Sequence, residues 1–426
     1  MTIATEKLFT QALGMIPPWE VADVKLDTEK RRIDFEVRCT AKKLPCPACG
    51  DANQGIHDRM RRSWRHLDFF QFEAWLHSDV PRVACGKCGK TTQTDVPWAR
   101  PGSGFTMMFE ALALSLCQST SVRQAAVLLR CDDKQLWRRI AFYVEQARAA
   151  EDMSGVTVVG IDETSVKRGH HYITVVHDLE RKRLLFATEG RDNLTLKAFV
   201  KDFEEHGGQA SEIEHACTDM STAFIKGVGE FLPQAAINFD RFHVVKLAGE
   251  AMDQVRKDEK RESPAELKAI AKDDRKKLMW AMRANPKDWT SGQIDAMHHL
   301  SHSNLKSARA WRLKTGLQDV YARSRIHNSV ELAEADLRRW MSWARRCRLD
   351  PFKKLATTIK THFDGIVRGM FDNRTNAFVE AMNGSLQQAK RAARGYRSVR
   401  NYILIAYLRM AKLEHLPASP FVKRGL

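Results

Sequence analysis

Acidic residues follow short apolar runs at three points of the chain. Asp162 follows the β-branched run Val156–Ile161, Asp219 follows Ile213–Thr218, and Asp240 follows Ala235–Phe239. A short apolar run of this kind is typical of a buried strand. An unpaired carboxylate at the mouth of such a strand costs free energy, but it is well placed to hold a metal ion. We therefore expect Asp162 to end its strand and to meet other carboxylates there.

A fourth acidic residue, Glu380, lies on a predicted helix with one polar face. Asn376, Glu380, Asn383 and Gln387 recur at offsets of 0, 4, 7 and 11 residues, which places them along a single stripe of a helix. We expect this stripe to face the acidic strands and to carry Glu380 to them.

Four of the nine cysteines form two C-x-x-C pairs. The pairs are Cys46 with Cys49 and Cys85 with Cys88, and each is followed directly by glycine. Two residues between thiolates let one tight turn present both sulfurs to one ion, so the pairs predict a tetrahedral zinc site. The alternative is reduced, unligated thiols. The long stretch between the pairs contains the strand-like run Phe69–Leu76 and predicts a β insert.

The chain is strongly basic. Its 426 residues carry 69 Lys or Arg against 52 Asp or Glu, a formal net charge of +17. Such an excess indicates a polyanionic partner, most often nucleic acid, although a basic but ordinary enzyme is the alternative. The segment Ala381–Leu426 concentrates the charge, with nine basic residues and one acidic residue. No apolar run reaches the roughly 20 residues of a membrane helix, and no signal peptide is recognisable, so we expect a cytoplasmic protein.

Three helices are expected over Phe105–Gln118, Val122–Leu129 and Lys134–Ala149. Only a short turn separates the last two, as in a helix-turn-helix that inserts its final helix into the DNA major groove. A plain helical linker bundle is the alternative. The DNA-facing candidates are Lys134, Gln135, Arg138 and Arg139 on the last helix, and Lys390, Arg391, Arg394 and Arg397 in a basic run that would suit a phosphate backbone.

The order of elements after residue 150 predicts a mixed sheet. Three strands, a helix, a strand, a helix and a strand follow one another, which matches the ribonuclease H topology. In that fold, carboxylates at the ends of the first and fourth strands meet. Residues 250–370 read as helices, with a capping box at Ser263–Glu266. Their five tryptophans are expected mainly in the core of a helical subdomain.

At this point the chain resembles the bacterial insertion-sequence transposases with a DDE catalytic domain, of the ISL family. The resemblance covers roughly residues 40–410. It is carried by the cysteine pairs, the helix-turn-helix, Gly160–Glu163, Thr218-Asp219, Asp240-Arg241-Phe242-His243, Asn376–Asn383 and Gly395-Tyr396-Arg397. It implies Asp162, Asp219 and Glu380 as the three acidic metal ligands, with Asp219 rather than Asp240 as the second acid.

The resemblance also implies a multidomain α+β fold, with a ribonuclease H-like mixed α/β core interrupted by a helical insertion. The expected domains are a zinc-binding N-terminal domain (1–100), a helix-turn-helix region (101–150), the first part of the core (151–249), the helical insertion (250–368) and the last part of the core with the basic tail (369–426).

The implied activity is DNA cleavage and strand transfer with Mg²⁺ or Mn²⁺, on terminal inverted repeats and target DNA, in the nucleoid of a bacterium. A homodimer or higher oligomer would pair the DNA ends. His243 would contact the scissile phosphate or the leaving oxygen, or make a structural hydrogen bond. Two alternatives remain: a transcription regulator derived from a transposase, and a ribonuclease H-like nuclease or resolvase.

Overall fold

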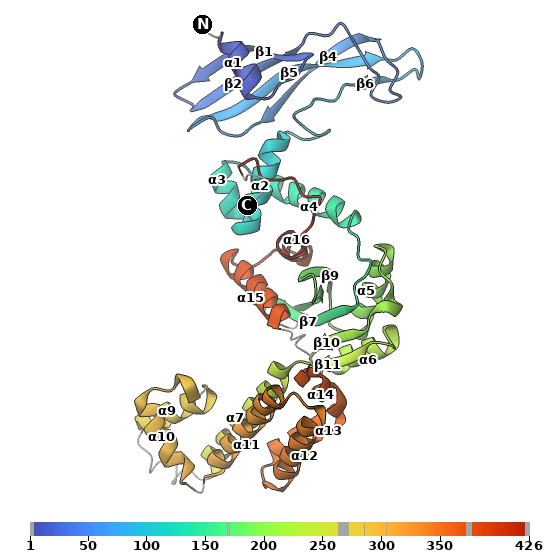
Figure 1. Ribbon diagram of the computed structural model, residues 1–426. Helices are drawn as coiled ribbons and strands as arrows, with labels where there is room; N and C mark the ends of the chain where they lie inside the picture. Colours follow the sequence, from blue (N-terminus) through green and yellow to red (C-terminus); the bar gives the residue numbers. More distant parts are fainter. Residues whose placement is uncertain are drawn as a thin grey trace. The chain divides into compact units, whose positions relative to one another are not determined.

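The computed structural model describes residues 4–167, 169, 171–262, 272–284, 286–303, 305–371 and 377–421. The predicted capping box at 263–266 lies outside the described residues. The chain forms two compact units, Met1–Ala149 with Leu413–Leu426, and Ala150–Lys412. Both units are drawn in Figure 1.

A six-stranded sheet dominates the first unit. Its main order is β1-β2-β5-β4-β3, and β6 pairs with β5. Alternate residues of β2, Ile33, Phe35 and Val37, are buried, as expected for a strand with one face on a core. The bounds are α1 Thr5–Ala12, β1 Trp19–Asp27, β2 Arg32–Cys39, β3 Lys43–Leu44, β4 Gln54–Arg65, β5 Glu73–Ala84 and β6 Thr91–Gln93. The predicted β insert between the cysteine pairs is present as β4 and β5. Its predicted run Phe69–Leu76 starts too early, because residues 66–72 form the β4–β5 hairpin connection.

Three helices follow the sheet: α2 Met107–Ser119, α3 Val122–Leu129 and α4 Asp133–Ala149. Thr106 and Ser121 cap the first two by accepting hydrogen bonds from backbone amides. Arg130 ends α3 in the left-handed conformation, with φ of 53°. The turn before α4 is therefore short, as the sequence predicted.

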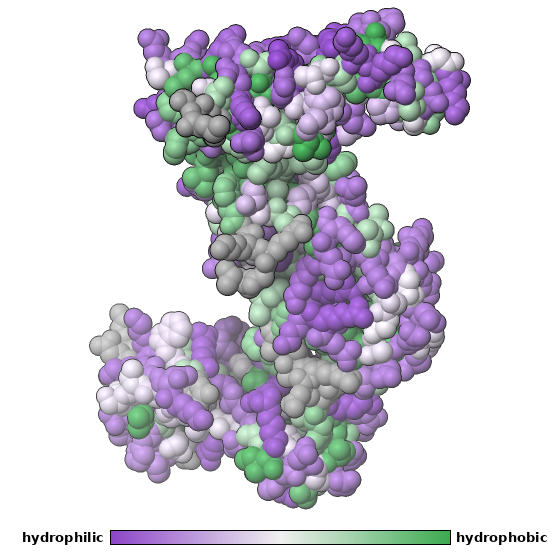
Figure 2. Space-filling view, turned by 45° about the horizontal axis from the view of Figure 1, so that its top comes forward, coloured by the Kyte–Doolittle hydropathy of each residue, from purple (hydrophilic) through white to green (hydrophobic). Residues whose placement is uncertain are grey.

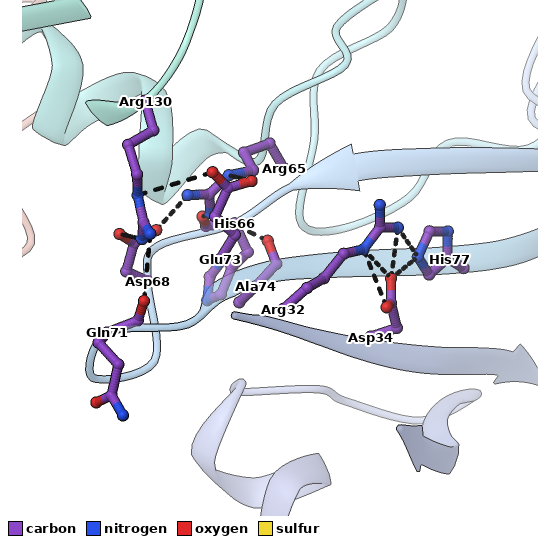
Figure 3. Close-up of polar contacts among 10 residues, drawn as sticks. All are labelled: Arg32, Asp34, Arg65, His66, Asp68, Gln71, Glu73, Ala74, His77 and Arg130. Atoms are coloured by element: carbon purple, nitrogen blue, oxygen red, sulfur yellow. Dashed lines mark hydrogen bonds and ion pairs between the residues drawn. The ribbon is translucent and has the colours of Figure 1, made fainter. Parts of the chain in front are cut away.

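Ion pairs join the β4–β5 hairpin to this turn (Figure 3). Arg65 is only 2% exposed, and its guanidinium contacts Asp68 and Glu73. Arg130 reaches the same two carboxylates from the end of α3 and donates to the Gln71 carbonyl at 3.2 Å. A buried guanidinium is tolerated only when it is paired. The network therefore holds the hairpin against the helix-turn-helix within this unit.

A five-stranded mixed sheet forms the centre of the second unit, in the order β11-β10-β7-β8-β9. β7, β8 and β9 are antiparallel neighbours, whereas β10 and β11 run parallel to β7. The elements are β7 Val158–Lys167, β8 His171–Asp178, β9 Arg183–Glu189, α5 Asn193–Glu205, β10 His215–Thr218, α6 Thr222–Phe231 and β11 Ala236–Phe239. This is the predicted order.

Asp162 does not end its strand, contrary to the prediction. β7 continues to Lys167 because β8 pairs with it along that length, and Asp162 lies opposite Val175. On its other side, β7 pairs with β10 only as far as Gly160. Asp162 therefore lies just beyond the parallel pairing, where β7 loses one neighbour.

The described residues of the segment after β11 are mainly helical. The first, α7, begins at Arg241 rather than near 250 and continues to Glu262. The others are α9 Lys272–Arg283, α10 Ser291–Ser301, α11 Lys306–His327, α12 Val330–Arg346, α13 Asp350–Thr361 and α14 Phe363–Phe371. Trp340 is buried in their shared core, and Trp289 and Trp311 pack against it. Trp280 and Trp343 are exposed, so the core interpretation fits three of the five tryptophans.

The last insertion helix, α14, returns to the sheet and packs on β11. Its two glycines make close approach possible: a Cβ on Gly369 would lie 2.2 Å from the Phe239 carbonyl oxygen, and one on Gly365 would lie 2.6 Å from the Phe239 ring. Arg368 donates to the Ile237 carbonyl at 3.0 Å. This contact anchors the insertion beside β11, before α15 (Ala377–Ala392) and α16 (Val399–Met410) complete the unit.

Gly369→Ala is therefore expected to destabilise the second unit. The added methyl has no space against the β11 backbone, and overpacking typically costs about 1–3 kcal/mol. Gly384→Ala on α15 is the matched control, because nothing lies within 4 Å of its Cβ position and alanine stabilises a helix interior by about 1 kcal/mol. Thermal unfolding should show a lower midpoint for the first variant only. Equal midpoints would contradict the close approach.

Hydrophilic side chains cover most of the surface visible in Figure 2. Among the described residues, no helix is long and apolar enough to cross a membrane.

Candidate functional site

Three aspartates lie just past the end of the parallel pairing of β7, β10 and β11. Cys217 of β10 pairs with Gly160 of β7, and Thr218 pairs with Phe239 of β11. Continuing this register, Asp219 lies between Asp162 and Asp240. Because neighbouring strands are about 4.8 Å apart, Asp162 and Asp240 then lie on either side of Asp219, and the charge of Asp219 acts on Asp162.

Asp162 is held by groups from two elements. The Asn383 side-chain amide on α15 donates to one carboxylate oxygen at 2.6 Å, and the Glu163 backbone amide donates to the other at 2.7 Å. Burial raises the pKa of the Asp162 carboxyl, and the negative charge of Asp219 adds to that rise. Asp219 is fixed in turn by the Ser221 backbone amide at 2.9 Å.

The α15 stripe faces β7, as predicted from its polar spacing. Beyond Asn383, the Gln387 amide donates to the Thr164 hydroxyl at 2.7 Å and the Ser165 carbonyl at 2.8 Å. The Lys390 ammonium also donates to Ser165, at 2.7 Å. Asn376, the first member of the predicted stripe, lies outside the described residues. These bonds fix the helix that carries Glu380.

Glu380 meets Asp240 and His243. One ligand atom from each of the three residues lies within 4.8 Å of the other two. Burial raises the pKa of the Glu380 carboxyl to about 7, and the charge of Asp240 and a hydrogen bond with it act in the same direction. From the sequence, Asp219 and Asp240 were alternative candidates for the second acidic metal ligand. In the structure Asp240 lies beside Glu380, and the charge of Asp219 acts on Asp162.

The raised pKa of Glu380 predicts a pH dependence of stability without a metal ion. Its pKa rises from about 4.5 to about 7, so the folded protein binds more protons than the unfolded chain between these values. The stability that Glu380 contributes is complete below pH 4.5 and is lost as the pH rises through 7. Relative to Glu380→Gln, the wild type with its zinc but no other divalent ion should lose thermal stability between pH 5 and pH 8. A constant difference would contradict the shift.

The four paired cysteines converge in the first unit. Cys46 and Cys88 have sulfurs 3.8 Å apart, and Cys49 and Cys85 have sulfurs 3.6 Å apart. Tetrahedral zinc with bonds of about 2.3 Å requires a sulfur separation of about 3.8 Å. All four sulfurs lie within 4.8 Å of one another, so the donor set fits one zinc ion.

The two cysteine turns have the same backbone pattern. Gly50 donates to the Cys46 carbonyl at 2.8 Å, and Gly89 donates to the Cys85 carbonyl at 3.0 Å. Both glycines have positive φ, 73° and 68°, a conformation that costs glycine little. Backbone amides of Cys88 and Lys87 lower the pKa of the Cys85 thiol to about 7, which favours the thiolate that binds zinc.

Two of the predicted DNA contacts face inward instead. Arg139 pairs with the fully buried Glu110 at 2.8 Å, and burial lowers its pKa. Lys390 is committed to Ser165. The other predicted contacts are exposed: Lys134, Gln135 and Arg138 on α4, and Arg391, Arg394 and Arg397 at and beyond the end of α15.

Comparison with known proteins assigns the family. Residues 159–406 match the sequence profile described as transposase, the DDE type named for ISL3. That match covers more than half of the chain. The chain belongs to the ISL3 family of transposases. Residues 94–144 match the helix-turn-helix domain of the same family, and residues 42–88 match the zinc finger of the transposases of IS204, IS1001, IS1096 and IS1165.

Curated relatives agree along nearly the whole length. The transposase of insertion sequence element IS1557 from Mycobacterium tuberculosis is 29% identical, with 97% of each chain covered. The transposase of IS1001 from Bordetella parapertussis is 25% identical, with 88% of this chain and 90% of the relative covered. The predicted family and DNA transposase activity are confirmed, and the zinc-finger match and the sulfur cluster support a structural zinc site.

The Asn383–Asp162 contact was not predicted from the sequence, although Asn383 belongs to the predicted polar stripe. Asp240 was predicted only as an alternative to Asp219 for the second acid. Both omissions concern pairings that depend on where α15 and β11 lie.

Proposed function

We propose that Asp162, Asp219 and Glu380 bind the catalytic Mg²⁺, or Mn²⁺, of this transposase. The single observation that supports the proposal is the strand register that ends with Cys217 opposite Gly160, two residues before Asp219 and Asp162. The Glu380 helix is fixed to β7 through Asn383 and Gln387. Carboxylate oxygens are the ligands that these hard cations select. When bound, such ions stabilise the attacking and leaving oxygens of a displacement at phosphorus.

The chain's own residues prepare this site. Asn383 and the Glu163 amide each donate to one oxygen of Asp162, so they fix the orientation of its carboxylate. Glu163 itself lies near Arg191, at 3.8 Å, and is not counted as a ligand. His243 belongs to the site because it lies within 4.8 Å of Glu380. No side chain is required as a covalent nucleophile.

The proposed DNA surfaces are the exposed start of α4 and the basic end of α15. Lys134, Gln135 and Arg138 would read the terminal inverted repeats from the major groove. Arg391, Arg394 and Arg397 would contact phosphates of the ends or of target DNA. Arg139 and Lys390 are left out because each is held by an internal partner.

We further propose the domain division 1–100, 101–150, 151–249, 250–368 and 369–426, with the α7 start moving the third boundary back toward Arg241. Pairing two element ends would require at least a homodimer. Its place of action would be the bacterial nucleoid.

The test is cleavage of a labelled duplex that carries the element's own end, with a scrambled duplex of equal length as control. We expect nicking at the end with Mg²⁺ or Mn²⁺ and none with metal chelated. Binding without cleavage under either metal, on single and on paired ends, would favour the regulator. Equal cutting of branched DNA without end sequences would favour the nuclease or resolvase.

A further inference from the structure

Asp240, His243 and Glu380 form a cluster of three metal-binding side chains, of which the proposed catalytic triad uses only Glu380. They come from two segments: Asp240 directly precedes α7, His243 lies in its first turn, and Glu380 comes from α15. A three-residue offset at a helix start places two side chains on the same side. Their ligand atoms lie within 4.8 Å of one another and of Glu380.

The donor atoms of this cluster are buried and lack other partners. Asp240 is 9% exposed. Within the described part of the chain, one oxygen of Asp240, one oxygen of Glu380 and Nε2 of His243 have no hydrogen-bond partner. A buried polar atom without a partner destabilises the folded protein. Three such atoms on the residues of one cluster indicate a ligand that would satisfy them together.

The chemistry of the three donors selects a divalent cation. When both carboxyls are ionised they repel each other at this distance, and a cation between them would replace the proton that they otherwise share. The imidazole nitrogen distinguishes the cluster from an all-oxygen site. Mixed nitrogen and oxygen donors suit Mn²⁺ better than Mg²⁺, which prefers oxygen and water.

We propose that Asp240, His243 and Glu380 form a divalent-cation subsite with a nitrogen ligand and a preference for Mn²⁺ over Mg²⁺. It lies next to the position that Asp162 and Asp219 offer, and Glu380 serves it directly. The proposal rests on the proposed function because Glu380 belongs to both. It gives His243 a role different from the phosphate contact or structural hydrogen bond expected from the sequence, and it makes Asp240 a fourth functional carboxylate.

The experiment is Mn²⁺ binding to the full chain, loaded with one zinc per chain and otherwise metal-free. Binding is followed by electron paramagnetic resonance, and pulsed measurements detect a nitrogen bound directly to Mn²⁺. The variants are Asp240→Asn, His243→Asn and Asp219→Asn. Asparagine suits the residue before a helix about as well as aspartate, so Asp240→Asn should keep α7. Glu189→Gln, an exposed acid at the end of β9, is the control.

We expect two Mn²⁺ ions per chain in wild type, one of them with nitrogen coupling. Asp240→Asn should weaken the binding of that ion at least tenfold, and His243→Asn should remove its nitrogen coupling. Asp219→Asn should weaken the binding of the other ion. Mg²⁺ should displace the nitrogen-coupled Mn²⁺ ion less readily than it displaces the other Mn²⁺ ion. Glu189→Gln should bind as wild type does.

One Mn²⁺ ion without nitrogen coupling, unchanged in Asp240→Asn, would overturn the subsite and leave the proposed catalytic triad in place. One nitrogen-coupled ion that is lost in Asp240→Asn but retained in Asp219→Asn would support the subsite. That second result would remove Asp219 from the proposed function.

Discussion

Asp219→Ala is expected to lower strand cleavage by about a thousandfold or more while end binding stays unchanged. The variant removes the carboxylate beside Asp162, which we propose as a metal ligand. Loss of a metal ligand forfeits several kcal/mol of charge stabilisation, and each 1.36 kcal/mol is tenfold in rate. The proposed DNA surfaces on α4 and at the end of α15 are not altered. Single-turnover cleavage and a gel-shift titration measure the two quantities separately.

Glu189→Gln is the matched control for this prediction. It also neutralises an acid at the end of a strand of the same sheet, so it tests whether loss of negative charge alone lowers the rate. We expect wild-type cleavage. If Asp219→Ala still cuts and Asp240→Ala does not, the second catalytic acid is Asp240.

Cys46→Ser is expected to unfold the zinc-binding sheet domain and to abolish recognition of the element's ends. Structural zinc supplies about 10–16 kcal/mol of apparent binding free energy in small zinc domains. This equals or exceeds the free energy of unfolding of a typical domain. The four sulfurs form one cluster, so the loss of one weakens the whole site. Zinc content, limited proteolysis and footprinting on terminal DNA should all show the change.

Cys131→Ser is the control for zinc loss. Cys131 lies in the turn between α3 and α4 and outside the sulfur cluster. It should keep one zinc per chain and the wild-type footprint. An unchanged footprint in Cys46→Ser would remove the zinc domain from end recognition.

Features with a local cause could be predicted from the residues. The C-x-x-C-G turns follow from the reach of two thiolates around one ion and from glycine at positive φ. The helix Val122–Leu129 was predicted with its bounds because Ser121 caps it and the turn after it is short. The order of strands and helices in the catalytic unit followed from apolar runs separated by turn residues.

Features that depend on distant partners could not be predicted. The length of β7 beyond Asp162 depends on its pairing with β8, because the local pattern suggested that the acidic residues end the strand. Arg139 appears in sequence as one more basic residue at a helix start. Only the packing of α4 on α2 brings Arg139 to the buried Glu110. A buried carboxylate needs an ion-pair partner, so Arg139 pairs with it instead of facing DNA.

The catalytic site also combines features that the sequence predicts with features that depend on the tertiary structure. The types of the acidic residues and the family motif fixed the chemistry as metal-dependent cleavage of DNA. Which acids share a cation depends on strand register and on α15. The parallel pairing ends at Cys217 with Gly160 and at Thr218 with Phe239, directly before the aspartates, and Asn383 reaches Asp162 across 221 residues of chain. No periodicity in one segment encodes such a contact, because it depends on how separate segments pack.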